Sequence, residues 1–188
     1  TRWSGRPDQP LPSHGDEGLP LRVVAVGHPP PVIAGGGLAG NLPESASATY
    51  VEQDLPAKIV RIGAEFGFGP GSARGALGLI AWVPGQPLTG HGHIAITPEG
   101  WVAATVRDGA LTEYASGEFR VPLVTDGRPY RAEVRFDGAT AALTLPDGTS
   151  ARGDHPDVAR LDGTVACWEF YREDADGAPV VLYRTWAA

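Results

Sequence analysis

The sequence has 188 residues, with one cysteine and no methionine. A single cysteine, Cys167, excludes a disulfide within the chain, so cysteine usage gives no information on the redox compartment. We expect Cys167 to be a small buried hydrophobe. No apolar run approaches the roughly 20 residues of a membrane-spanning helix, so membrane insertion is not expected. Thr1 does not open a signal peptide. Removal of a leader and removal of an initiator methionine both stay open.

Positive charge is also scarce. The net charge is -7 and Lys58 is the only lysine, while the arginines are scattered. Binding to nucleic acid depends on clustered basic side chains that neutralise phosphates, so no nucleic-acid partner is expected. Arginine in place of lysine, with abundant Ala, Gly and Pro, is typical of a G+C-rich genome. We therefore expect an actinobacterium or one of its phages as the source. The location stays open, with an extracellular, cell-surface or virion location favoured.

Tight-turn signals are abundant in the second half of the chain. Asp and Gly tolerate positive φ, which two-residue hairpin turns require, and the runs between these dipeptides mostly alternate apolar and polar residues. The composition, with 26 Gly and 18 Pro, agrees with many turns and no long helix. The sequence predicts an all-β fold. The Asp-Gly dipeptides begin at Asp108, Asp126, Asp137, Asp147, Asp162 and Asp176.

The chain is expected to have two parts. Residues 1–20 are rich in Pro, Gly and charge without periodicity, which predicts an extended N-terminal arm. Trp3 either pins this arm to the body or to a neighbouring subunit, or is a loosely packed terminal side chain. Residues 21–188 are expected to form one domain, an antiparallel two-sheet β-sandwich of jelly-roll, concanavalin A-like type. The loop over residues 28–37 is expected to be broken by proline and glycine.

Hydrophobic periodicity places the strands. Residues 57–68 alternate, with one apolar face and one face of polar or glycine residues. The apolar face is expected to hold Val60, Ile62, Ala64, Phe66 and Phe68. Residues 76–83 are almost all apolar, which favours a central strand covered on both faces. Residues 156–160 could form one helical turn capped by Asp154 or His155. Further strands are expected at residues 21–26, 48–55, 91–97, 101–107, 111–119, 130–136, 141–145, 164–172 and 180–186, the last two as a pair.

Four segments resemble the concanavalin A-like lectin/glucanase superfamily, in particular its laminin-G-like jelly-roll modules. They are AKIVRIGAEFGF, ALGLIAWV, HIAITPEGWVAATV and PYRAEVRFDGATAALTLPDG, within a resemblance that spans roughly residues 45–188. The resemblance implies a sandwich fold and a choice among lectins, glycosidases, lyases and structural modules, because fold alone does not decide function. Calcium, common in such modules, is implied as an optional ligand of loop carboxylates.

The sequence offers no catalytic pair. The Glu-x-Asp-x-x-Glu motif of retaining glycosidases in this superfamily is absent, and Glu65 stands alone. Glu169 and Glu173 have the spacing of a pair, but Glu173 heads into a turn. Glu169 lies between two aromatic residues on an apolar strand, where it either forms an ion pair with an arginine such as Arg61 or Arg184, or contacts a ligand.

The histidine and aromatic candidates for ligand binding could equally have structural roles. His91 and His93 lie on one face at a spacing that can serve a metal, yet a third ligand is missing, so hydrogen-bonded strand residues are the alternative. Aromatic rings can stack on sugars, but each also suits a sandwich core. The candidate ligand-binding residues are Trp82, His91, His93, Trp101, Tyr114, Glu169 and Tyr171. No catalytic residue and no resident metal are predicted.

Three functions follow from this reading. The first is a non-catalytic recognition or attachment module that binds a glycan at a cell surface. The second is a structural component of a multi-subunit assembly, such as a phage tail or capsid decoration protein, with a homo-oligomer or assembly partner held through the N-terminal arm. The third is a glycoside hydrolase or lyase that uses Glu169 or Glu65.

Overall fold

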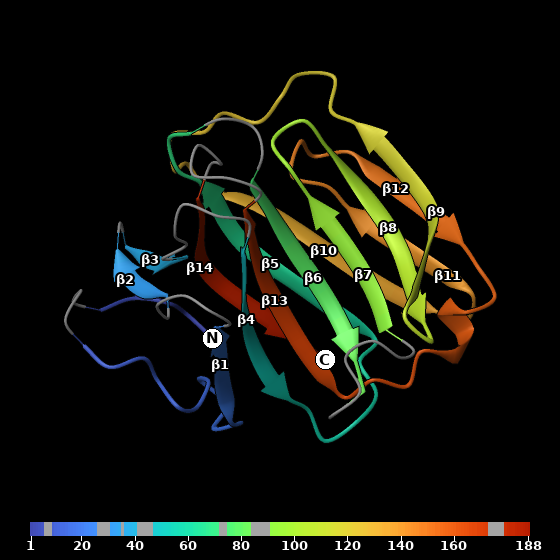
Figure 1. The fold of residues 1–188 in the computed structure, drawn as a ribbon, viewed down its shortest axis with the longest axis horizontal. Coiled ribbons are helices and arrows are strands. Elements are labelled where there is room, and N and C mark those ends of the chain that lie inside the picture. Colours follow the sequence, from blue (N-terminus) through green and yellow to red (C-terminus); the bar gives the residue numbers. More distant parts are fainter. Residues whose placement is uncertain are drawn as a thin grey trace.

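The computed structural model describes residues 1–5, 9–25, 31–34, 36–40, 47–71, 75–83, 91–172 and 179–188. Within them the chain forms fourteen strands and one 3-10 turn, Val158–Arg160. The strands build two seven-stranded antiparallel sheets that pack face to face (Figure 1). The predicted all-β sandwich is confirmed. No helix in the described residues has the length and apolar character needed to cross a membrane.

The two sheets are named here by their place in Figure 1. The front sheet has the order β1-β4-β13-β6-β7-β8-β9 and the back sheet the order β12-β11-β10-β5-β14-β3-β2. The front strands are β1 (Leu21–Ala25), β4 (Ser47–Asp54), β6 (Gly75–Trp82), β7 (His91–Ile96), β8 (Gly100–Arg107), β9 (Ala110–Glu118) and β13 (Val165–Arg172). The back strands are β2 (Val32–Ala34), β3 (Gly37–Ala39), β5 (Arg61–Phe68), β10 (Tyr130–Asp137), β11 (Thr140–Thr144), β12 (Ser150–Asp154) and β14 (Val180–Ala187).

Asp-Gly dipeptides close hairpins as their turn chemistry predicts. Arg107 pairs with Ala110 across the two-residue turn Asp108-Gly109, where φ is 51° at Asp108 and 78° at Gly109. Two positive φ values in succession are the mark of a type I′ turn. Asp137-Gly138 and Asp147-Gly148 lie at the β10–β11 and β11–β12 connections. The meander over β7, β8 and β9 is also confirmed.

The interior is filled by the inward-facing residues of both sheets. On β5, residues Ile62, Ala64, Phe66 and Phe68 are buried in the main core, as their alternation predicts. Val60 departs from that face because it precedes the strand and is half exposed. Every residue of β6 is buried, which confirms a central strand covered on both sides.

Three local predictions are corrected. The segments at residues 164–172 and 180–186 form strands that belong to different sheets, β13 and β14, because alternation marks a strand but does not choose its partner. The predicted loop at residues 28–37 contains β2 and the start of β3 among its described residues. The turn Val158–Arg160 is 3-10, and neither Asp154 nor His155 is its N-cap, which is Asp157 without a side-chain bond.

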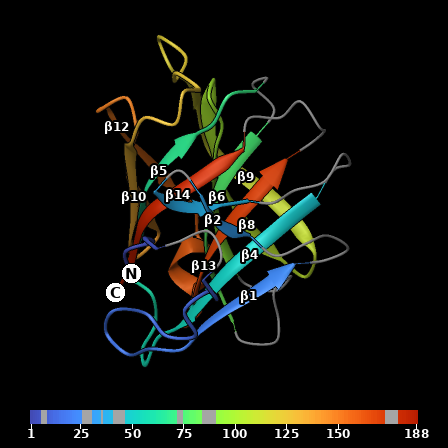
Figure 2. The same cartoon turned by 90° about the vertical axis from the view of Figure 1, so that its left-hand side faces the viewer.

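The N-terminal segment is anchored on the back sheet by Trp3. Arg2 forms an isolated antiparallel β-bridge with Arg184 of β14. The Trp3 backbone N–H donates to the Tyr183 carbonyl at 2.9 Å. The Trp3 indole, 1% exposed, donates from Nε1 to Thr185 Oγ1 at 3.2 Å. Of the alternatives for Trp3, the structure therefore shows an indole that pins the segment to the body. The two ends of the chain lie side by side (Figure 2).

Replacing Trp3 with Ala should lower the free energy of unfolding by about 3–5 kcal/mol, because a fully buried indole leaves a cavity and an unpaired Thr185 hydroxyl. Urea denaturation followed by fluorescence or circular dichroism measures this change. Arg2→Ala, which removes an exposed neighbouring side chain, is the matched control. Equal stability of the two variants would contradict the anchoring role.

Candidate functional site

The outer face of the front sheet carries a second apolar cluster, separate from the sandwich core. Leu77, Leu79 and Ala81 of β6 pack into the main core, so the residues between them point to the other side of the sheet. There Ile80 and Trp82 join Val165 and Cys167 of β13 in a buried group. These four side chains are themselves buried, so the groups at the edge of the cluster are the ones that a ligand could reach.

A carboxylate stands at the edge of this apolar group. Glu169 Oε2 lies 3.4 Å from His93 Nε2, and the two side chains are 13% and 23% exposed. The Tyr50 hydroxyl forms a hydrogen bond with the Glu169 carboxylate. Gly78 lies opposite Glu169, and a Cβ atom at Gly78 would stand 2.8 Å from Glu169 Oε2. The absence of a side chain at Gly78 therefore leaves the space that the Glu169 carboxylate occupies.

The Glu169 cluster is defined here as Tyr50, Trp82, His93 and Glu169. The predicted arginine partner of Glu169 is wrong, because Arg61 and Arg184 belong to β5 and β14 of the back sheet, whereas His93 and Tyr50 come from strands of the same sheet as Glu169. The Tyr50 and Trp82 rings lie 5.7 Å apart at 48°. The cluster thus joins two aromatic rings, an imidazole and a carboxylate on four strands.

Burial sets the protonation of the groups around Glu169. Burial, followed by the charge and the hydrogen bond of Glu169, raises the pKa of Tyr50 above its usual range. Burial also raises the pKa of Cys167, and the nearby carboxylates of Glu169 and Glu52 raise it further. Tyr50 is therefore a neutral hydrogen-bond donor at neutral pH. Cys167 is a thiol without nucleophilic character, as its predicted role of a buried hydrophobe implies.

The structure brings four of the seven predicted site residues to one face. Trp82, His93, Glu169 and Tyr171 lie on the outer face of the front sheet, and Tyr171 is 38% exposed. His91 lies on β7, but its side chain is outside the described residues. Trp101 points into the sandwich core. Tyr114 packs against that core and stacks on His155, with ring centroids 6.0 Å apart.

Sequence reasoning missed Tyr50. The alternation of residues 48–55 places Tyr50, Glu52 and Asp54 on one strand face, which is the signal that could have singled it out. Its importance depends on β4 lying next to β13, where Tyr50 pairs with Glu169. That neighbourhood joins residues 119 positions apart in sequence, and local patterns carry no information on it.

The candidate carboxylates do not form a pair. Glu65 lies between the inward-facing Ala64 and Phe66 of β5 and so points outward from the back sheet. Glu169 points outward from the front sheet, and the sandwich core separates the two. Glu173 lies outside the described residues. Among the residues that the structure describes, no group of three or more His, Cys, Asp or Glu side chains is arranged to hold a metal ion.

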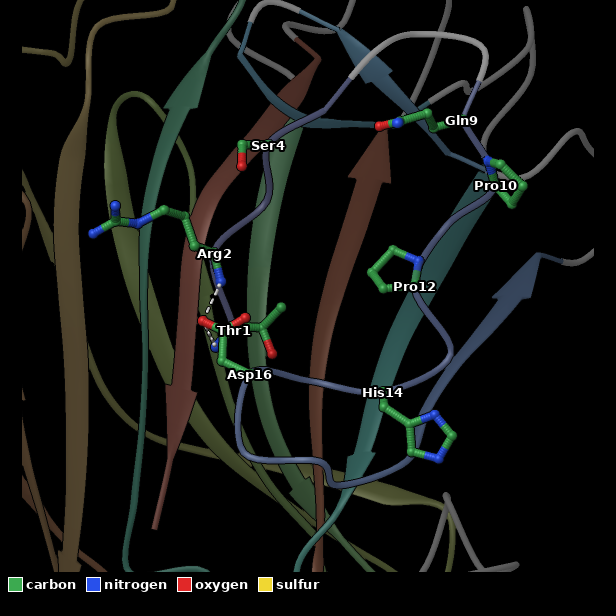
Figure 3. A pocket seen from close by; sticks show the side chains of 8 residues that line it. All are labelled: Thr1, Arg2, Ser4, Gln9, Pro10, Pro12, His14 and Asp16. Atoms are coloured by element: carbon green, nitrogen blue, oxygen red, sulfur yellow. Dashed lines mark hydrogen bonds and ion pairs between the residues drawn. The ribbon is translucent and has the colours of Figure 1, made fainter.

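A separate pocket of about 440 Å³ lies within the N-terminal segment. Figure 3 shows that one stretch of extended chain supplies its whole lining. Asp16, the acid of the pocket, already accepts a hydrogen bond from the Arg2 backbone N–H at 3.0 Å. The pocket brings together no aromatic platform, so the Glu169 cluster is the stronger candidate. Its lining is Thr1, Arg2, Ser4, Gln9, Pro10, Pro12, His14 and Asp16.

The outer face of the back sheet carries a polar cluster of a different kind. Buried Glu133 accepts hydrogen bonds from Trp186 Nε1 at 2.8 Å and from Arg135 Nε at 2.7 Å. Arg131 lies over the Trp186 ring, 4.8 Å from its centroid. Burial acts to raise the pKa of Glu133, but the hydrogen bonds from Arg135 and Trp186 outweigh it and hold the pKa below its usual range. This cluster is satisfied internally.

Comparison with known proteins shows the fold. No protein-family model matches the sequence, and none of the curated proteins does. Carbohydrate-binding module CBM66 from Bacillus subtilis aligns with a TM-score of 0.62 and 12% identity over 88% of this chain and 94% of that one. The CBM2 module of the evolved Dit of Lactobacillus casei BL23 phage J-1 aligns with a TM-score of 0.58 and 14% identity, over 85% and 78%.

Chicken galectin 2 aligns with a TM-score of 0.47 and 10% identity over 73% of this chain and 97% of that one. At such identities a likeness shows the fold alone. The two matches above a TM-score of 0.5, together with the two antiparallel sheets, make this chain a β-sandwich of the jelly-roll type.

Replacing Glu133 with Gln should destabilise the protein by about 1–3 kcal/mol near neutral pH, because two donors lose a charged acceptor. A carboxyl whose pKa is lowered on folding contributes stability above its unfolded pKa, and this stability is lost as the pH falls through the folded pKa. The difference between variant and parent should therefore shrink as the pH falls below the usual range of a glutamate side chain, about 4. Urea denaturation at a series of pH values measures it.

The control is Asp137→Asn, which removes an exposed carboxylate from the same strand. It should leave the free energy of unfolding near that of the parent at neutral pH. A Glu133→Gln variant as stable as this control would contradict the assigned hydrogen bonds.

Proposed function

We propose that this protein is a non-catalytic recognition module that binds a glycan through the outer face of its front sheet, at a cell surface. The observation that carries the proposal is the Glu169 cluster. It places a carboxylate, an imidazole and a phenol next to aromatic surface on a sheet face that is already partly removed from water. Protein sites for small polar ligands combine apolar walls with a few fixed polar groups in this way.

Each member of the cluster has a role that suits a sugar. The Glu169 carboxylate accepts hydrogen bonds from hydroxyl groups, and a charged acceptor makes stronger bonds than a neutral one. His93 and the neutral Tyr50 hydroxyl orient that carboxylate. Tyr171, the more exposed ring, lies two residues from Glu169 on β13 and offers a surface for the apolar face of a sugar ring. The Trp82 ring packs beside Tyr50 on the same face.

The solved structures support the same class of function. The matches from Bacillus subtilis and from phage J-1 are both described as carbohydrate-binding modules. Transferring this role to the present chain is part of the proposal, as is the finer laminin-G-like assignment made from the sequence. Binding is proposed to need no cofactor. A calcium requirement would appear as loss of binding in the presence of EDTA.

A second candidate function is a structural part of a multi-subunit assembly. The phage J-1 match, a module of a Dit protein, favours it. The two candidates are compatible, because an assembly component can also carry a recognition face.

If the assembly role is correct, the full chain should form a fixed oligomer in solution. Size-exclusion chromatography with light scattering should give one mass, a multiple of the 19.6 kDa of the chain, that does not change over a wide concentration range. A stable monomer at every concentration would contradict the assembly role and leave the glycan proposal intact.

Glycan recognition is tested with a Glu169→Gln variant on an array of bacterial cell-wall and plant polysaccharides, followed by calorimetry on the glycans that bind. The parent protein should bind, and the variant should bind at least about tenfold more weakly, because loss of a charged acceptor costs about 1.5–3 kcal/mol. Gln preserves the shape of the side chain, so folding should be unchanged by circular dichroism.

Glu65→Gln is the matched control, since it makes the same chemical change on the outer face of the back sheet. It should bind like the parent. Failure of the parent to bind any glycan would overturn the proposed function, and equal binding by all three proteins would remove Glu169 from the site.

A further inference from the structure

We infer that the glycan is an extended, neutral chain that lies across the strands of the front sheet, from the Glu169 cluster on β13 to a second subsite on β9. This inference rests on the proposed function and adds the length, the direction and the charge class of the ligand. It follows from the strand register, from a cavity distant from Glu169, and from the charges on this face.

The register places one continuous row of residues across six strands. Each member of the row stands directly opposite the next, and residues that pair in this way point to the same face of a sheet. The side chains of Glu169 and His93 lie over Gly78. Beyond them the side chains in the row are small and leave a shallow trough over β7, β8 and β9. From β4 to β9 the row is Tyr50, Glu169, Gly78, Ala95, Val102 and Ser116.

The next row forms one wall of this trough. It places His93 and Ile80 beside Ala95 and Gly78, and it ends at Glu113 on β9. On the opposite side, Tyr171 pairs with Ala76. The side chains of His93, Ile80 and Tyr171 are therefore longer than those of Ala95 and Val102, and they form the walls of the trough.

A cavity marks the far end of the trough. It has a volume of about 350 Å³ and opens over β7, β8 and β9. Neighbouring strands are about 4.8 Å apart, so the distance from β13 to β9 is roughly 19 Å. A trough of this length exceeds one sugar ring, and a chain of several rings is needed to fill it. The lining residues are Ala95, Thr97, Glu99, Gly100, Trp101, Val102, Ser116, Gly117 and Glu118.

Polar groups at this second subsite suit hydroxyl groups as well. Ser116 Oγ lies 2.6 Å from Glu113 Oε1, to which it donates, so its lone pairs remain to accept from a ligand. Glu118 pairs with Gly100 at the rim. The second subsite therefore combines an apolar floor, formed by Ala95 and Val102, with hydrogen-bond acceptors. The Glu169 cluster has the same combination of apolar and polar groups.

The charges of the described residues on this face oppose the binding of an acidic glycan. The strand faces carry the carboxylates of Glu169, Glu113 and Glu118, and the net charge of the chain is -7. Arg22 on β1 is already bound by Glu52 at 3.1 Å and by Asp54. A carboxylated or sulfated polymer would meet like charges within a Debye length, which opposes binding. A neutral chain meets hydrogen-bonding groups and apolar floor without this repulsion.

Calorimetry with neutral oligosaccharides tests the length and the charge class. Cello-, manno-, xylo- and laminari-oligosaccharides are compared as disaccharides and as hexasaccharides, beside a hexamer of galacturonic acid. For the neutral series that binds, the hexasaccharide should bind at least about tenfold more tightly than the disaccharide, because it reaches the second subsite. The galacturonate hexamer should not bind at the same concentrations.

Ala95→Trp fills the trough between the two ends and should weaken hexasaccharide binding by about tenfold or more while leaving the disaccharide little changed. Ser116→Trp, at an exposed position, makes the same test at the far end if the first variant fails to fold. Ala142→Trp is the matched control, because Ala142 is exposed on the outer face of the back sheet, and it should bind both sugars like the parent.

The outcomes separate the two proposals. If none of the sugars, nor any glycan of the array, binds to the parent, the proposed function fails and this inference with it. If disaccharides bind as tightly as hexasaccharides, or if the Ala95 and Ser116 variants bind hexasaccharides like the control, the extended site is wrong while the Glu169 site stands. Preferred binding of the galacturonate hexamer would overturn the neutral assignment.

Discussion

The pairing of β13 with β6 is the constraint on which the rest of the structure depends. It places Trp168 and Leu79 opposite each other inside the sandwich and, one residue further, Glu169 opposite Gly78 on the outside. A shift of one residue would turn every side chain of β13 to the other face and carry a carboxylate into the core, where an unpaired charge is very unfavourable. The interior packing therefore fixes where the outer carboxylate stands.

The same pairing explains why an acid is tolerated on so apolar a strand. Gly78 gives the carboxylate space, and Tyr50 and His93 lie close enough to satisfy it. Partial burial lowers the local dielectric, which strengthens these bonds and raises the cost of leaving a partner unpaired. A ligand hydroxyl that joins this group enters a site whose polar partners are already oriented, so little ordering is left for the binding step.

Sequence patterns predicted the elements better than their arrangement. The alternation of β5 and the Asp-Gly turns of the β7–β9 meander depend on neighbours in the chain, and both were predicted. The separation of β13 from β14 into two sheets depends on long-range packing, as does the meeting of Tyr50 with Glu169. For Trp101 the pattern was uninformative, because β8 is apolar on both faces and shifts register between Ala103 and Ala104.

The two outer faces differ in how side chains fill the space above the strands. On the back sheet, Trp186 lies over Gly63 and its indole is bound by Glu133, while Arg131 covers the ring. Long side chains thus fill the space above the strands and satisfy one another. On the front sheet, the row beyond Gly78, through Ala95 and Val102, leaves that space open, and acceptors lie at its two ends. The front sheet is therefore the face on which the proposed ligand has space to lie between its acceptors.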